Sequence, residues 1–225
     1  MRDADCRRLR ENYVVILWRI FSLTAVTVGL FLCRPSTPLA AQNSEPSPIQ
    51  DAEEYAVYSA VLNAEFAAET ATRQFVIDDY TPSPKKPKFT GFIGGLTFSG
   101  AALPRLPPQT AADFDAKIKE SSALERKFSL NLPYVLVSEC DLRKIFPPDA
   151  QGHIDAGPWQ QFYEKYPGAL GIISLSRVGF NSTKQEAVVR VAVQYGLLGG
   201  SGKVFVLSKR SEKWEIRKKV TIWLS

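Results

Sequence analysis

Residues 187–224 have the sequence AVVRVAVQYGLLGGSGKVFVLSKRSEKWEIRKKVTIWL, in which runs rich in β-branched and aromatic residues alternate with glycine-rich or charged segments. Such runs are typical of β-strands, and the short turn segments between them predict antiparallel pairing. Together with the run that precedes them, they predict four strands, over residues 170–180, 187–195, 203–208 and 214–224. The intervening residues 181–184, 199–202 and 210–213 have the composition of turns.

Apolar and polar side chains alternate within these runs. The run at 187–195 has Val189, Val191, Val193 and Tyr195 on one face, and Arg190 and Gln194 on the other. This period of two predicts a sheet with one buried face and one solvated face.

Helical patterns precede the strand-rich region. Asp51 is a suitable N-cap for a helix that contains Tyr55 and Tyr58 at helical spacing and ends near Thr72. Further helices are expected from an N-cap at Thr110, after Ser138 and from residue 157, and short strands are expected over 74–80 and 134–137. We therefore expect an α+β fold, with helices packed on a curved, mainly antiparallel sheet of about four to six strands concentrated in the C-terminal third.

A long segment without periodicity interrupts this pattern. Residues 81–109 contain six prolines and four glycines, a density that breaks helices and strands. We expect a long surface loop here, inside a single domain that spans residues 51–225.

The charged strand Lys213-Trp214-Glu215-Ile216-Arg217 resembles the penultimate or final strand of cystatin-like and nuclear transport factor-like cone domains. The segments at 175–181 and 222–225 resemble an uncharacterised family of exported bacterial proteins. The resemblance implies helices packed into a curved antiparallel sheet. Cone domains include isomerases, dehydratases, scaffolds and binding modules, so the resemblance implies no particular activity.

The N-terminal segment has the features of an export signal. Four arginines occur within the first ten residues, an apolar stretch follows, and Leu39-Ala40-Ala41 offers a small-residue cleavage site. The uninterrupted apolar part, Ile20 to Cys33, has 14 residues, which is short for a spanning helix of roughly 20. We expect residues 1–41 to be a signal peptide, or alternatively a signal anchor, followed by a disordered spacer over 42–50. The protein is then periplasmic or extracellular, or membrane-anchored with its domain outside.

Removal of residues 1–41 changes the charge and the cysteine content. That segment holds six of the 28 basic and three of the 23 acidic residues, so 22 basic and 20 acidic residues remain, a net charge of +2. Nearly balanced charge argues against a nucleic-acid partner. Cys6 and Cys33 leave with the segment, which would make Cys140 a lone thiol, most often a small buried apolar residue.

No motif with a demanding chemical spacing occurs in the chain. The single histidine, His153, lies in a segment that resembles part of a calcium loop, but prolines occupy the positions of the first and last ligands. Gly196 to Lys203 lacks the glycine and hydroxyl positions of a phosphate-binding loop and precedes a strand, so it is interpreted as a hairpin turn. We expect no metal and no cofactor. The basic residues near the end of the chain are interpreted as a solvated face, a protected sheet edge or a patch for an acidic partner.

These observations favour a non-catalytic exported domain that binds an envelope partner or a small ligand. The candidate ligand-binding residues, chosen from the concave face of the sheet and its aromatic mouth, are Tyr195, Trp214, Trp223 and Arg177. Two alternatives stay open. One is a small isomerase or dehydratase with Asp78 or Asp79 as the base and a tyrosine as the donor to an oxyanion. The other is a structural subunit of an envelope assembly.

Overall fold

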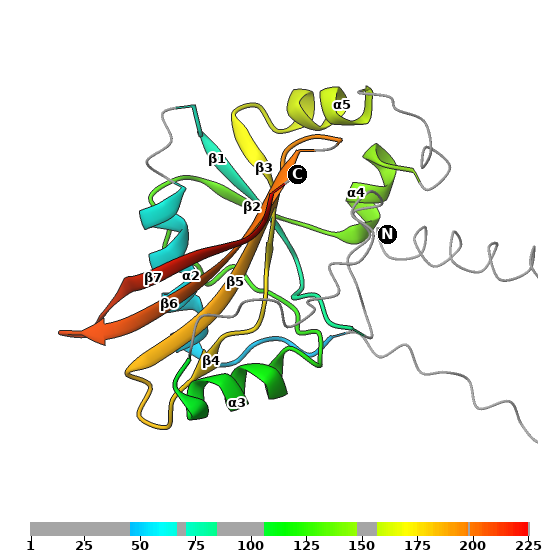
Figure 1. Cartoon of the computed structure of the whole chain (residues 1–225). Coiled ribbons are helices and arrows are strands. Elements are labelled where there is room, and N and C mark those ends of the chain that lie inside the picture. Colours follow the sequence, from blue (N-terminus) through cyan, green and yellow to red (C-terminus); the bar gives the residue numbers. More distant parts are fainter. Residues whose placement is uncertain (1–45, 67–70, 85–105, 148–156, 198, 225) are drawn as a thin grey trace, which may run out of the picture. The chain divides into compact units, whose positions relative to one another are not determined.

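A computed structural model of the chain describes residues 46–66, 71–84, 106–147, 157–197 and 199–224, all within one compact unit that spans Glu45–Ser225. Four helices and seven strands occur in these residues (Figure 1). In chain order they are α2 (Ala52–Glu65), β1 (Gln74–Asp78), α3 (Pro108–Lys117), β2 (Tyr134–Val137), α4 (Glu139–Ile145), α5 (Gly157–Lys165), β3 (Ala169–Leu175), β4 (Gly179–Phe180), β5 (Glu186–Gln194), β6 (Gly200–Arg210) and β7 (Lys213–Leu224).

The strands form one mixed sheet in the order β2-β1-β3-β5-β6-β7, and the two-residue β4 pairs with the end of β5. Strands β3, β5, β6 and β7 are antiparallel neighbours, which confirms the strands expected in the last third of the chain. The α+β class is therefore confirmed. The run expected as one strand over 170–180 is divided into β3 and β4, and β6 begins at Gly200, inside the expected turn.

Two parallel pairings complete the sheet on its other side. Strand β1 lies between β2 and β3 and runs parallel to both, with Phe75 opposite Tyr134 and Ile77 opposite Ile173. Strands β1 and β2 were both expected from their composition, but a short apolar run does not indicate which other strand it pairs with. The sheet therefore has seven strands, more than the expected number.

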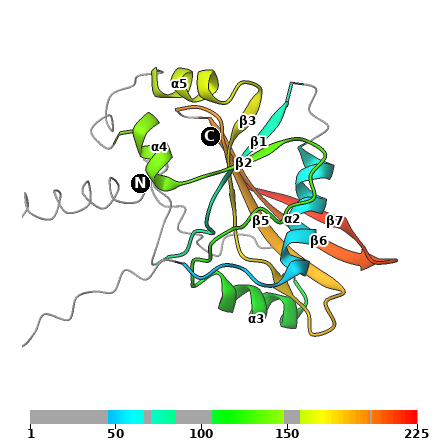
Figure 2. The ribbon, with the colours of Figure 1, turned by 180° about the vertical axis from the view of Figure 1, so that it is seen from behind.

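Helices cover both faces of the sheet (Figures 1 and 2). Helix α2 packs on one face against side chains such as Phe75, Val189 and Phe205. On the other face, α4 and α5 pack over Val76 and Ile172, and α3 packs over β4 and β5.

The expectation of a solvated second face is therefore wrong along β5. Arg190 and Gln194 are both buried, and the Arg190 guanidinium lies 5.3 Å from the centre of the Phe114 ring of α3. Alternation of polar residues did not reveal this because a long polar side chain can extend under a covering helix.

The helix boundaries follow local capping. The Asp51 side chain accepts a hydrogen bond from the Glu53 amide and so caps α2, as expected, but the helix ends at Glu65, before the expected end near Thr72. Helix α3 differs from its expected start, because its N-cap is Pro107 and Thr110 lies buried within its first turns. The fixed φ of proline suits the first positions of a helix, so Pro108 starts it without a side-chain cap.

Part of the expected spacer at 42–50 belongs to the folded unit. The Ile49 amide donates to the Ala123 carbonyl, and the Ile49 side chain is buried. The Ser47 carbonyl also accepts a hydrogen bond from the Ala123 amide, so backbone pairing and one buried apolar side chain together attach the segment. Residues 1–45 and 85–105, which include the expected signal segment and most of the expected loop, lie outside the described residues. In the part of the chain that is described, no helix is both long and apolar enough to cross a membrane.

A buried ion pair joins the first turn of α2 to the chain between β3 and β4. The fully buried Glu54 carboxylate accepts hydrogen bonds from the Arg177 guanidinium at 2.7 and 3.0 Å and from the Val178 amide at 3.1 Å. The Tyr58 hydroxyl donates to the same carboxylate, and burial and the Glu54 charge raise the pKa of this tyrosine. A buried carboxylate is tolerated only with such a set of partners.

We expect the Arg177→Met substitution to lower the free energy of unfolding by about 3 kcal/mol, because it leaves the buried Glu54 charge without the cation that donates two hydrogen bonds to it and with only Lys117, at 4.0 Å, as a counter-charge. Urea denaturation measures this change. In Glu54→Gln/Arg177→Met the charge is absent, so part of the stability should return. The control is Lys144→Met, which breaks an exposed pair with Asp141 and should cost less than about 1 kcal/mol. Equal costs for the two single variants would contradict the assignment.

Candidate functional site

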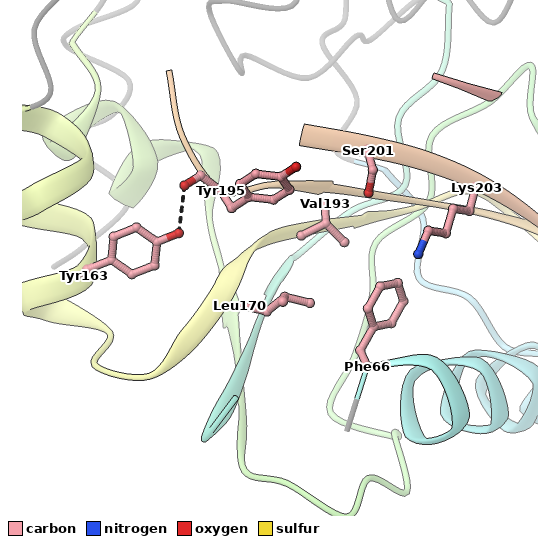
Figure 3. A pocket seen from close by; sticks show the side chains of 7 residues that line it. All are labelled: Phe66, Tyr163, Leu170, Val193, Tyr195, Ser201 and Lys203. Atoms are coloured by element: carbon pink, nitrogen blue, oxygen red, sulfur yellow. Dashed lines mark hydrogen bonds between the residues drawn. The ribbon is translucent and has the colours of Figure 1, made fainter. Parts of the chain in front are cut away.

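A cleft of about 380 Å³ lies on the face of the sheet that α2 covers, beyond the C-terminal end of that helix (Figure 3). Four structural elements, the turn after β5 and the C-cap of α2 contribute to its walls. The lining residues are Phe66, Tyr163, Leu170, Val193, Tyr195, Ser201 and Lys203. Five of them are aromatic or aliphatic side chains, two of which carry a phenol hydroxyl, and the other two add a hydroxyl and an ammonium group, which is a composition common in small-ligand sites.

A glycine bulge in β3 helps to shape the cleft. Gly171 has a φ of 142°, and a Cβ atom there would overlap the carbonyl of Gln194, so only glycine fits without strain. The register of β3 against β1 shifts at this point. The shift places Leu170 with the cleft-facing cluster, whereas Ala169 and Ile172 pack on the opposite face.

Tyr195 is fixed at the mouth of the cleft by its backbone. The Tyr163 hydroxyl of α5 donates to the Tyr195 carbonyl at 2.9 Å, as Figure 3 shows, and the Tyr195 amide donates to the Gly199 carbonyl. Burial raises the pKa of Tyr163, so this phenol stays protonated as a donor. The Tyr195 ring itself packs on Gly199, where a Cβ atom would overlap it, and remains 44% exposed.

Three charged groups lie at the other end of the cleft. The Glu65 carboxylate accepts hydrogen bonds from Lys203 at 2.7 Å and from Lys219 at 3.0 Å, so two cations share one anion. Burial raises the pKa of Glu65, but the two lysines outweigh burial and hold the pKa below its ordinary value of 4.5. The Lys203 ammonium also lies 5.4 Å from the centre of the Phe66 ring.

The other three candidate residues lie outside the cleft. Trp214 is buried against α2, and its indole nitrogen donates to Glu53 at 2.9 Å. The Arg177 guanidinium is bound to Glu54 and to the Ser122 hydroxyl. Of the four residues chosen from the sequence, only Tyr195 lines the cleft.

Trp223 covers two glycines of β6. Its indole lies so close to Gly200 and Gly202 that a Cβ atom at either position would meet it. These glycines alternate with Ser201 and Lys203 along the strand, so the indole lies on the face opposite the cleft. Its large area fills the space above a strand segment without side chains, which is a structural role.

The aspartates considered for an enzyme lie at the carboxyl end of β1. Asp78 is buried and accepts a hydrogen bond from the Ser174 hydroxyl of β3. The Tyr80 hydroxyl donates to Glu139, and burial, followed by the Glu139 charge, raises its pKa. None of the seven described residues that line the cleft carries a carboxylate or an imidazole, so the structure does not bring these groups together with Tyr195.

His153 lies outside the described residues, and within those residues no cluster of three or more metal-ligating side chains occurs. Cys140 is half-buried and disulfide-bonded. The interpretation of this residue as a lone thiol is therefore wrong for this structure.

The basic residues of β7 lie along an edge of the sheet. Register shifts interrupt the pairing of β7 with β6 at two places, between Gly202 and Lys203 and between Val206 and Leu207. Bulges and exposed cations are features that keep an edge strand from pairing with other chains. The protected-edge interpretation of these residues is thus the one that the geometry favours.

Comparison of the chain with protein-family models, with curated proteins and with solved structures found no match.

Sequence reasoning missed most of the cleft. The sequence patterns place Phe66 within the first expected helix, Tyr163 within the helix expected from residue 157, and Leu170 within the strand expected over 170–180. Lys203 falls at the junction of an expected hairpin turn and the next expected strand. The available signal was alternation, because Lys203 is the polar member on the apolar face of its strand, together with Phe205 and Leu207.

We expect Glu65→Gln to lower the free energy of unfolding by about 1 kcal/mol at pH 7. Because the folded-state pKa of Glu65 is lowered, its contribution is complete above pH 4.5 and is lost as the pH falls through the folded-state value. Urea denaturation over a pH series should therefore show the two proteins converging in acid. Glu212→Gln, at a largely exposed carboxylate, is the control. A difference that persists unchanged at pH 2 would contradict the assignment.

Proposed function

We propose that this protein is an exported binding domain that takes a small ligand with an apolar body in the cleft beside Tyr195. Export rests on the N-terminal sequence, with its arginines, apolar stretch and small-residue site. Binding rests on the cleft.

One observation carries the proposal. Among the described residues, Tyr195 and Leu224 are the large apolar side chains left exposed, at 44% and 73%. Tyr195 lines the cleft, and Leu224 is the cross-strand neighbour of Ser201, which also lines it. Exposed apolar side chains collected around one concavity are typical of a surface that binds an apolar group.

The composition of the cleft favours binding over catalysis. Its polar groups are the Ser201 hydroxyl, the Tyr195 phenol, the Tyr163 phenol that donates to the Tyr195 carbonyl, and the Lys203 ammonium in an ion pair. A general base needs a group that accepts a proton near neutral pH and lies within hydrogen-bond distance of the substrate. The described walls of the cleft provide apolar contact area and a few hydrogen-bond donors.

We expect the folded protein to bind N-phenyl-1-naphthylamine with a Kd below about 100 μM. This probe is neutral and consists of a naphthalene and a phenyl ring joined by an amine. Tyr195→Ser should weaken binding about fivefold to tenfold, because the ring supplies apolar contact area. Tyr195→Phe keeps the ring and is the matched control, with affinity close to that of the unaltered protein. Probe fluorescence measures the affinities, and circular dichroism checks that each variant is folded.

The proposal is abandoned if the probe does not bind or if Tyr195→Ser binds it as well as the unaltered protein does. A crystal structure with the probe adds a second criterion. Probe density against Asp78 or Asp79, away from Tyr195, would favour the isomerase or dehydratase alternative.

A further inference from the structure

We infer that the ligand of this cleft is an amphipathic acid, with one anionic group at Lys203 and an apolar body directed toward Tyr195. The inference rests on the proposed function, since it names the chemistry of the ligand for the same site. It follows from the charges, donors and walls of the cleft.

The first argument is the charge at the end of the cleft that Lys203 lines. Lys203 and Lys219 share the single carboxylate of Glu65, at 2.7 and 3.0 Å. One positive charge is left over in this group. The Lys203 ammonium lies at the cleft wall with a side chain only 21% exposed, so solvent screens it less than a free surface lysine.

The second argument is a fixed set of donors. Glu65 and the ring of Phe66 hold the Lys203 ammonium in place, which reduces the entropy lost when a ligand binds. Ser201 lies two residues earlier on β6, so both side chains are on the same face of the sheet (Figure 3). In the described part of the chain the Ser201 hydroxyl has no hydrogen-bond partner, and it is therefore available as a second donor to an anion.

The third argument is the distribution of apolar groups. Val193, Leu170 and the Tyr195 ring line the cleft together with Lys203 (Figure 3). An anion at Lys203 thus leaves its attached carbon skeleton against apolar walls. A volume of about 380 Å³ is at the small end of ligand pockets, which suits a molecule of up to about three rings or a short acyl chain.

The contribution of Glu65 separates this inference from a purely structural role of the lysines. If these charges only stabilise the fold, Glu65→Gln lowers the stability of the protein and raises its affinity for neither probe. If the surplus positive charge binds an anion, the same substitution removes the carboxylate that competes with the anion for Lys203. Affinity for an anionic probe then rises although stability falls.

The test compares two probes with the same rings. One is 8-anilinonaphthalene-1-sulfonate, which carries one sulfonate, and the other is the neutral N-phenyl-1-naphthylamine. We expect the full chain to bind the sulfonate about tenfold more tightly than the neutral probe, and this advantage should shrink as salt is raised. Lys203→Met should remove the advantage and leave the neutral probe unaffected.

Two further variants complete the design. Lys218→Met removes the same charge from an exposed position that pairs with Val206, on the other face of the sheet, and should keep the advantage. Glu65→Gln should increase affinity for the sulfonate by about threefold or more. This variant keeps the test decisive even where Lys203→Met folds poorly.

The outcomes distinguish the inference from the function on which it rests. Equal affinity for the two probes, with Tyr195→Ser weakening both, overturns the anionic ligand and leaves the binding domain in place. An advantage for the sulfonate that Lys218→Met removes as fully as Lys203→Met also overturns it. Failure of both probes to bind the folded protein removes the proposed function itself.

Discussion

The need to neutralise one buried carboxylate organises much of this fold. Glu54 has no contact with solvent, and its partners come from helix α2 itself, from the Arg177 side chain and from the Val178 backbone. These groups are far apart in the sequence, so the ion pair fixes the start of α2 against the chain between β3 and β4. The position of α2 on the sheet then determines where its C-terminal end lies, and that end forms one wall of the cleft.

The two ends of α2 differ in how their charges are balanced. At the first turn, Arg177 and Lys117 are matched by the carboxylates of Glu54 and Asp113. At the last turn, two lysines meet one carboxylate close to solvent. A buried site cannot tolerate an uncompensated charge, whereas a site at the surface can. The surplus at the C-terminal end of α2 is therefore compatible with stability and available to a ligand.

Local patterns in the sequence predicted the elements whose determinants are local. Asp51 caps α2 through its own side chain, Ser138 caps α4 in the same way, and the β-branched runs of the last third form antiparallel neighbours. The parallel partners of β1 were not predictable, because residues 74–78 contain nothing that specifies a neighbour. The helix cover on the second face of the sheet was not predicted for a related reason. An arginine is typical of a solvated position, but Arg190 lies under α3.

The candidate site was predictable in part. All four candidate residues were assigned to the concave face of the sheet and its aromatic mouth, and the structure places Tyr195 in the cleft. Trp214, Trp223 and Arg177 lie outside it. Each makes contacts within the protein that the sequence does not show, with Glu53, with the glycines of β6 and with Glu54. Aromatic and arginine side chains serve both structural and binding roles, and only their surroundings distinguish the two.

The mixed sheet has a consequence for the order in which the chain gains structure. Strands β5, β6 and β7 are hairpin neighbours and close through short turns, whereas β1 must meet β2 and β3 across long intervening segments. Closing long segments costs more entropy before any contact is gained, so non-local pairing is slow. We expect the hairpins to acquire amide protection early in refolding and the parallel strands late, which pulse-labelled hydrogen exchange would resolve. A chaperone that binds the partly folded chain would then contact a formed antiparallel meander of β5, β6 and β7, before β1 has paired with the sheet.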